Sequence, residues 1–462
     1  MKIEEILNIT NGSLIVGNQE SQCNNFFKDT REKEIGDTYI GIKGEKFDGS
    51  KLWREALDRG ASTVIVENIE FKKQQVKDLQ GKNIIKVSNT LLALSEIAKY
   101  KRKQYLKNLK VIGITGSVGK TSTKDIIYSV LKQKYKTFKT YGNNNNLIGL
   151  PFQILNLREQ EMAILEMGMN HVGEIKKLSQ IAQPDISVIT NIGTSHIGNL
   201  GSRENILSAK LEILEGMKKK VLVINNDNDL LHDYYKKNRN VKIYTYGIHN
   251  DSEIMARNIE IEDDFSQFTY YSQNGKQIKV KVPVAGIHFI YNALCAVTIG
   301  KYFALNDEEI VKGIEEFELT KKRMDIIKLK SNIIIINDSY NASLESMQAS
   351  LQYLGSLKSR RKIAVLGDML ELGNYSKELH EKVGKEVVKN NINILVCRGE
   401  NSKYIIKSAK ESMKENNIYY FDTNDEIEKF IKQISKTGDA ILFKASNGMK
   451  FFEIVDNLLR EC

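Results

Sequence analysis

Short apolar runs alternate with longer amphipathic stretches along most of this chain, and the alternation predicts an α/β fold. Between about residues 107 and 317, stretches with helical periodicity separate the runs, which is typical of strands in a parallel sheet. The predicted central strands are 111–114, 162–165, 186–190 and 221–224. The pattern repeats from residue 318 onward, with predicted strands at 333–336, 363–366, 392–396 and 440–443.

Two further patterns complete the predicted architecture. Up to about residue 106, short strands mix with one helix near 52–59; the predicted strands are 39–42, 63–66 and 84–87. Alternating residues flank Asn274-Gly275, a dipeptide that favours a tight hairpin, so we expect an antiparallel appendage on the central segment. We therefore predict three domains, over residues 1–106, 107–317 and 318–462.

Composition agrees with this division and excludes several classes of protein. A chain of 462 residues with 41% apolar content is too long for one ordinary core. The formal charge of +10 comes from Lys mixed with Glu along the whole chain, which favours a solvated surface over a nucleic-acid-binding stripe. The cysteines have no paired spacing, so free thiols are expected rather than disulfides or a zinc site; they are Cys23, Cys295, Cys397 and Cys462.

The lengths of the apolar runs and the first residues of the chain indicate the cellular compartment of the protein. No run approaches the ~20 apolar residues that a membrane-spanning helix needs. The opening Met1-Lys-Ile-Glu-Glu lacks the basic and then apolar build of a signal peptide. We expect a cytoplasmic protein with no membrane insertion.

The strongest chemical signal is Gly116-Ser-Val-Gly-Lys-Thr121, which follows a predicted strand and opens an amphipathic helix. Backbone N–H groups of such a loop face phosphates, Lys120 adds positive charge, and Thr121 offers a hydroxyl to magnesium. The common phosphate loop has a glycine where Ile114 stands, so this loop is tighter than usual. It predicts an ATP site.

Polar residues follow the other predicted strands, where ligands of open parallel sheets bind. Glu166 ends one strand and is a candidate magnesium ligand, although an acidic turn residue is an equally good interpretation. The segment 191–196 follows the next strand and ends at His196. Lys210 lies beside an apolar helical stripe; it either snorkels to water or, as a carbamate formed with carbon dioxide, holds a second magnesium together with His196.

Further polar segments predict a cleft between two domains. The run 143–146 consists of four asparagines, which either form turns or offer amides to phosphate and carboxylate oxygens. In the third segment, strands end at 337–341, 367–369 and 444–448. Such ends suit an acceptor that one domain brings to ATP held by another.

With these motifs the chain resembles the Mur ligase family, ATP-dependent enzymes that add amino acids to the UDP-muramoyl peptide precursor of the bacterial cell wall. The motifs closely resemble those of the branch that adds D-alanyl-D-alanine. The resemblance spans all three segments, at 29–31, 44–49, 115–121, 143–151, 166–170, 191–196, 209–213, 292–294, Arg323, 338–342, 367–373 and 444–446.

The resemblance implies a small mixed α/β domain for the uridine nucleotide, a central phosphate-loop ATPase domain and a C-terminal Rossmann-like domain. It implies that catalysis depends on Lys120, His196 and Lys210. The implied ATP site comprises Thr115, Gly116, Ser117, Val118, Gly119, Lys120, Thr121, Ser122, Asn292, Arg323 and Asp338.

The remaining implied sites involve two magnesium ions and two organic substrates. Thr121 and Glu166 would serve the first ion, and His196 with carbamylated Lys210 the second. The uridine diphosphate end would meet Asp29, Thr30, Arg31, Lys43, Phe47, Asp48 and Gly49. The acyl substrate and the dipeptide would meet Asn143, Asn145, Asn146, Tyr340, Asn341 and Lys444.

The implied reaction joins D-alanyl-D-alanine to UDP-N-acetylmuramoyl-tripeptide through an acyl phosphate, a step of peptidoglycan synthesis and hence of cell shape and division. We expect a monomer that binds no nucleic acid. A sibling ligase adding lysine or diaminopimelate stays an alternative, although the Asp-Asn-Pro-Arg motif of the diaminopimelate branch is absent. Folylpolyglutamate and cyanophycin synthetases share the phosphate loop; they are not expected to carry the first-segment motifs.

The sequence disfavours proteins of three other classes. A GTP switch needs an Asn-Lys-x-Asp motif, which the chain lacks, and a nucleic-acid motor usually shows basic and aromatic stripes. A catalytically dead scaffold is disfavoured because Lys120, Glu166, His196 and Lys210 are all present.

Overall fold

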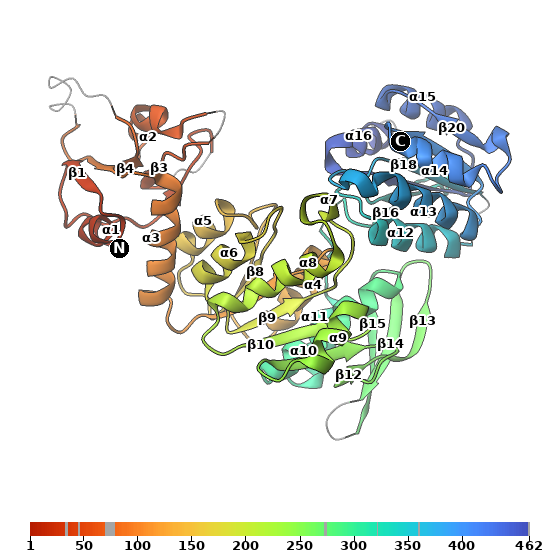
Figure 1. Ribbon diagram of the computed structural model, residues 1–462, viewed down its shortest axis with the longest axis horizontal. Helices are drawn as coiled ribbons and strands as arrows, with labels where there is room; N and C mark the ends of the chain where they lie inside the picture. The colour runs from red at the N-terminus through yellow and green to blue at the C-terminus, as the bar shows by residue number, and fades with distance from the viewer. Residues whose placement is uncertain are drawn as a thin grey trace.

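The computed structural model describes residues 1–32, 36–44, 47–69, 79–271, 275–320, 322–358 and 361–460. It has the predicted three-domain α/β architecture, in which an N-terminal and a C-terminal domain rise from opposite sides of a central domain (Figure 1). We call these the N-terminal, central and C-terminal domains. The boundaries near residues 106 and 317 stay predictions.

The N-terminal domain is a mixed five-stranded sheet in the order β1-β5-β4-β3-β2, in which only β1 runs antiparallel to its neighbour. The predicted strands and helix correspond to β3, β4, β5 and α2. The strands are β1 (Ser13–Val16), β2 (Phe26–Phe27), β3 (Thr38–Ile40), β4 (Thr63–Val66) and β5 (Asn83–Lys86), and the helices are α1 (Ile3–Thr10), α2 (Trp53–Asp58) and α3 (Thr90–Gln104).

The central domain contains a seven-stranded, wholly parallel sheet in the order β12-β11-β10-β9-β6-β8-β7. Its strands are β6 (Lys110–Thr115), β7 (Thr137–Lys139), β8 (Met162–Glu166), β9 (Ile186–Ile189), β10 (Val221–Asn225), β11 (Lys242–Gly247) and β12 (Ile254–Met255). Its helices are α4 (Lys120–Leu131), α5 (Gly149–Asn156), α6 (Glu174–Ala182), α7 (Ile197–Leu200), α8 (Arg203–Leu211), α9 (Asp229–Lys237), α10 (Ile287–Tyr302) and α11 (Asp307–Glu315).

The register of this sheet brings three strand ends to one place. Ile114 pairs with Glu166 across β6 and β8, and Thr115 pairs with Ile189 across β6 and β9. The residues that follow β6, β8 and β9 therefore lie at a common edge, as expected of parallel strands.

An antiparallel sheet, β13-β14-β15, extends the central domain as predicted. Its strands are β13 (Arg257–Ile261), β14 (Ser266–Tyr271) and β15 (Gln277–Val282). Asn274 of the predicted hairpin turn lies outside the described residues.

The C-terminal domain is a six-stranded sheet in the order β16-β17-β21-β18-β19-β20, parallel except for β16 at its edge. Four of its strands match the predicted ones. The strands are β16 (Asp325–Lys328), β17 (Ile334–Asn337), β18 (Arg361–Gly367), β19 (Ile394–Arg398), β20 (Ile418–Tyr420) and β21 (Asp439–Lys444), and the helices are α12 (Leu344–Ser356), α13 (Ser376–Lys389), α14 (Ser402–Ala409), α15 (Asn424–Ile434) and α16 (Phe451–Arg460).

Two buried cations of α3 join the N-terminal domain to the central one. Lys101 Nζ donates to the carbonyl of Leu155 at 2.5 Å in α5, and Arg102 Nε donates to the carbonyl of Ala182 at 2.9 Å in α6. Carbonyls at helix C-termini carry partial negative charge and lack intrahelical partners. These contacts fix α3 on two central helices.

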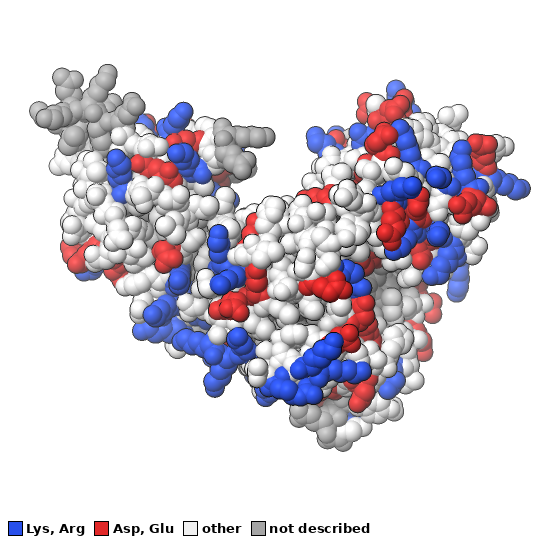
Figure 2. Space-filling model, viewed as in Figure 1, with Lys and Arg blue, Asp and Glu red and all other residues white. Residues whose placement is uncertain are grey.

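The distribution of charged side chains agrees with the prediction of a solvated surface of mixed sign. Figure 2 shows Lys and Arg on all three domains, mixed with Asp and Glu, and a wide hollow between the two arms. No helix within the described ranges is long and apolar enough to cross a membrane.

Candidate active site

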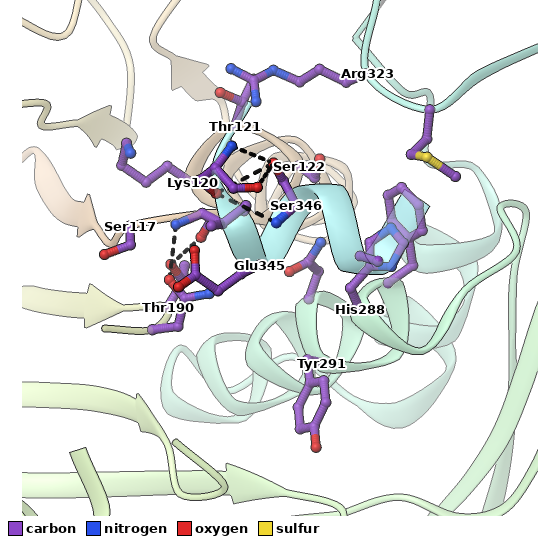
Figure 3. A pocket seen from close by; sticks show the side chains of 18 of the residues that line it. Ser117, Lys120, Thr121, Ser122, Thr190, His288, Tyr291, Arg323, Glu345 and Ser346 are labelled. Carbon is purple, nitrogen blue, oxygen red and sulfur yellow. Dashed lines mark hydrogen bonds between the residues drawn. The ribbon is translucent and has the colours of Figure 1, made fainter. Parts of the chain in front are cut away.

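A cavity of about 410 Å³ lies between the central and C-terminal domains. The central domain lines it with the phosphate loop and part of α10, and the C-terminal domain lines it with Arg323, Asp338, Lys444 and the start of α12. In Figure 3 the phosphate-loop residues lie at one end, and His288 and Tyr291 lie toward the other. The cleft predicted between two domains is therefore present.

Glycine is needed twice to shape the phosphate loop. Gly116 has φ +152°, and a Cβ atom there would lie 1.9 Å from Thr190 Oγ1. Gly119 caps α4 in a left-handed conformation, φ +82°. The first-turn N–H groups of α4, which have no intrahelical acceptors, thereby point toward the loop. Lys120 Nζ donates to the Gly116 carbonyl at 2.7 Å, and burial lowers its pKa.

The segment after β9 is hydrogen-bonded to the phosphate loop along its length. The N–H groups of Ser117 and Val118 donate to Asn191, the first to its carbonyl at 3.1 Å and the second to its Oδ1 at 2.9 Å. Gly193 N donates to Ser117 Oγ at 2.9 Å, and Thr190 Oγ1 donates to the Val118 carbonyl at 2.6 Å. The two segments therefore share one network of hydrogen bonds.

Glu166 lies beside the phosphate loop, where the strand-end rule predicts it. Its side chain is buried and accepts from Thr121 Oγ1 at 3.1 Å and from Asn145 Nδ2 at 2.9 Å. Lys124 Nζ lies 3.9 Å from the same carboxylate. Within the described ranges, no three His, Cys, Asp or Glu side chains gather closely enough to hold a metal ion. A magnesium ion at Thr121 and Glu166 would thus complete its oxygen shell with phosphates and water.

Lys210 is buried behind the loop. Its side chain is 2% exposed, and burial together with the charge of Lys120 lowers its pKa well below the ordinary value. The structure records no hydrogen bond or ion pair for this amine among the described residues. A buried amine without an acceptor is costly as a cation, so the uncharged form is favoured.

His196 lies at the domain interface and does not line the cavity. Its backbone is left-handed, φ +63°, and Nδ1 lies 2.6 Å from Glu371 Oε2 of the C-terminal domain. The contact with His196 lowers the pKa of Glu371, against the opposing effect of burial.

On the opposite wall, the C-terminal domain contributes a buried ion pair. Lys444 Nζ lies 2.5 Å from Asp338 Oδ2, and Ser350 Oγ donates to the same oxygen at 2.6 Å. Lys444 is only 1% exposed. The ammonium therefore faces Asp338. The contact with the dipeptide that the resemblance implies stays a prediction. Arg323 stacks over the ring of Tyr340 at 4.0 Å.

The far end of the cavity contains residues that the sequence analysis did not single out. Tyr291 donates to Asp227 Oδ2 at 2.9 Å, and this carboxylate also accepts from the backbone of Ile248 and Asn250. Burial lowers the pKa of His288 to about 4. Asp227 lies two residues after the end of β10, so the rule that ligands bind at strand ends also predicts it.

The remaining predicted residues divide between the interface and the N-terminal domain. Tyr340 OH donates to Asn143 Oδ1, Asn146 Oδ1 accepts from the first backbone N–H groups of α5, and Asn292 Oδ1 accepts from Thr123 Oγ1 at 3.0 Å. The residues proposed for the uridine end, Asp29, Thr30, Arg31, Lys43, Phe47, Asp48 and Gly49, belong to the N-terminal domain and do not line this cavity.

Comparison with known proteins agrees with this geometry. Three family models match the chain: "Mur ligase family, catalytic domain" over residues 29–102, "Mur ligase middle domain" over 114–300, and "Mur ligase, glutamate ligase domain" over 322–447. UDP-N-acetylmuramoyl-tripeptide–D-alanyl-D-alanine ligase of Bacillus subtilis (strain 168) is 38% identical over 439 residues, covering 93% of this chain and 92% of the relative. Its counterpart in Escherichia coli (strain K12) is 30% identical, covering 82% and 81%.

Solved structures give the same result. MurF from Acinetobacter baumannii superposes with a TM-score of 0.89 at 29% identity, covering 99% of this chain and 98% of that one. MurF from Thermotoga maritima in complex with ADP superposes with a TM-score of 0.81 at 27% identity, covering 94% and 96%. By its sequence, its fold and the cavity between its domains, this chain belongs to the Mur ligase family.

Proposed function

We propose that this protein is an ATP-dependent, ADP-forming ligase that joins D-alanyl-D-alanine to UDP-N-acetylmuramoyl-tripeptide. The observation that carries the proposal is a cavity lined by the phosphate loop on one side and by Arg323, Asp338 and Lys444 on the other. Relatives that carry this activity in their names align over nearly the whole chain. An ADP complex is known for one structural relative.

ATP would bind with its phosphates on the loop and the first turn of α4. Lys120, Thr121 and the N–H groups there supply positive charge and donors. Asn292 lies beside Gly119 and Thr123, while the Asp227–Tyr291 pair lies toward the other end of the cavity. Thr121 and Glu166 would hold one magnesium ion. Bound magnesium polarises phosphate oxygens and neutralises charge that develops during transfer.

A second ion is supported by the surroundings of Lys210. Its buried amine has no recorded acceptor and has a strongly lowered pKa, so it fits reaction with carbon dioxide. The resulting carbamate would carry negative charge next to Lys120, where the amine alone would face a like charge. His196, with Glu371 on its Nδ1, would serve the same ion.

The residues of this chain then position two substrates for two successive displacements. A carboxylate is a poor acyl donor, so the tripeptide carboxylate oxygen first attacks the γ-phosphorus and ADP leaves. The amine of D-alanyl-D-alanine attacks the carbonyl of the acyl phosphate, phosphate leaves with the oxygen, and the amine loses a proton. This chemistry needs positioning and cations rather than a protein nucleophile.

The uridine end of the precursor would lie in the N-terminal domain. Thr30 and Gly49 are buried, while the side chain of Phe47 is 56% exposed and available to a ligand. Arg31 pairs with Asp29 at 2.7 Å, and Asp48 accepts from Ser50 N at 2.9 Å, so both acids have polar partners within this domain. We further propose that the enzyme acts as a monomer in the cytoplasm.

The decisive experiment is an acceptor assay. Purified protein with ATP, magnesium, UDP-muramoyl-tripeptide and D-alanyl-D-alanine should release one phosphate per amide formed, and omission of the dipeptide should abolish amide formation. Precursor carboxylate labelled with ¹⁸O should pass one labelled oxygen to phosphate. Equal turnover with lysine or diaminopimelate in place of the dipeptide, on the matching shorter precursor, would favour a sibling ligase instead.

A further inference from the structure

Glu345 of α12 reaches from the C-terminal domain to the segment after β9. Its Oε1 accepts from Thr194 N at 2.7 Å, and its Oε2 accepts from Thr194 Oγ1 at 3.2 Å. In Figure 3 the side chain lies near Ser117 and Thr190, at the phosphate-loop end of the cavity. Thr194 is 8% exposed, so its N–H group would lose its recorded acceptor if the domains separated.

The other side of this short segment is bonded to the phosphate loop. Gly193 N donates to Ser117 Oγ at 2.9 Å, and Ser195 Oγ donates to the Ser117 carbonyl at 3.2 Å. The residues directly before and after Thr194 therefore contact one residue of the loop. One peptide segment joins Glu345 to the phosphate site.

Gly193 is the point where this arrangement leaves no space. A Cβ atom built there would lie 2.5 Å from Glu345 Cδ and within 2.8 Å of both carboxylate oxygens. The three atoms nearest to this position all belong to the end of the Glu345 side chain. A methyl group at residue 193 would consequently displace the carboxylate.

We propose that Glu345 is a positioning residue for ATP binding. Its hydrogen bonds to Thr194 hold the phosphate loop in the conformation that binds ATP when the C-terminal domain is docked. The proposal rests on ATP being the ligand of this cavity and adds the contact that couples domain docking to the loop. A ligand that contacts both domains binds more weakly when the docked state is less populated. A hydrogen bond to a charged acceptor contributes about 1.5–3 kcal/mol, which corresponds to a change of about tenfold or more in population.

The test compares Glu345→Ala, Gly193→Ala and the double variant. We expect each single variant to raise the dissociation constant of ATP, measured by calorimetry with magnesium, about tenfold or more. The double variant should bind no more weakly than Glu345→Ala, because the carboxylate that the methyl group would displace is then absent. Glu345→Gln retains an acceptor oxygen without the charge and should recover part of the affinity. Without nucleotide, X-ray scattering should give a larger radius of gyration for both single variants.

Gln352→Ala, at an exposed position of the same helix, is the matched control and should behave as wild type. A wild-type dissociation constant and radius of gyration in Gly193→Ala would overturn the proposal. Additive losses of ATP affinity in the double variant would also overturn it. So would a Glu345→Gln variant that binds ATP as weakly as Glu345→Ala. If the wild-type protein takes up no ATP, the proposed function fails. The scattering measurements need no nucleotide and still decide whether Glu345 docks the domain.

Discussion

The hydroxyl of Thr121 donates to the carboxylate of Glu166 at 3.1 Å, although 45 positions separate them along the chain. The parallel pairing of β6 with β8 explains the contact, because the loop and the acid follow neighbouring strands. Thr121 and Glu166 thus present two oxygen atoms to one point beside the phosphate loop.

Replacing Glu166 by Gln should weaken magnesium-dependent turnover. The change keeps the size of the side chain but removes the charge that attracts the cation, so we expect kcat/KM to fall about a hundredfold or more. The magnesium concentration for half-maximal rate should rise. Glu159→Gln, at an exposed ion pair with Lys136, is the control. An unchanged magnesium dependence would remove Glu166 from the metal site.

Replacing Lys210 by Ala should abolish most activity, and small carboxylates such as formate should restore part of it by occupying the position of the carbamate. In the wild-type protein, ¹³C-labelled carbon dioxide should give a carbamate resonance that Lys210→Ala lacks. Full activity of the variant without added carboxylate, or the same resonance in both proteins, would contradict the carbamate.

His288 should make the folded protein less stable as the pH falls from 6.5 to 4. Burial lowers its pKa from 6.5 to about 4, so within this window the unfolded chain binds more protons than the folded one. Above pH 6.5 the imidazole is neutral in both states and this penalty is absent. The melting temperature of His288→Gln, relative to wild type, should therefore rise as the pH is lowered from 7 to 4. A constant difference would show that His288 is not buried in its neutral form.

Lys444 and Asp338 should behave as a unit. Removing the ammonium with Lys444→Met leaves a buried carboxylate without its cation, which typically costs about 3–5 kcal/mol of stability. Asp338→Asn combined with Lys444→Met should unfold at a higher urea concentration than Lys444→Met alone. If instead Lys444→Met keeps wild-type stability and raises only the KM of D-alanyl-D-alanine, the lysine contacts the dipeptide directly.

The periodic signals of the sequence predicted most of the strands that form the interior of the sheets, although they missed β11 in the central sheet. The strands that they missed include β7, β12, β16 and β20, which lie at sheet edges and are short or partly exposed. Such strands have weak apolar patterns because a neighbour covers only one of their sides. Their pairing depends on tertiary contacts rather than on local sequence.

Residues of the site were predictable where one local rule applied to them. The strand-end rule predicted Glu166 beside the loop, and the glycine pattern predicted the loop itself. Glu345 and Glu371 gave no such signal, because their partners, Thr194 and His196, lie more than a hundred residues away along the chain. Contacts between domains depend on how whole sheets dock, which periodicity does not encode.

The two cations of α3 that close the ends of α5 and α6 have one more consequence. They tie the N-terminal arm to two helices of the ATPase domain, so the uridine end of a bound precursor would be held at a set distance from the phosphate loop. A peptide one residue too short would stop before the γ-phosphate. The length of the precursor peptide, and not only the chemistry of its side chains, would then help to select the substrate.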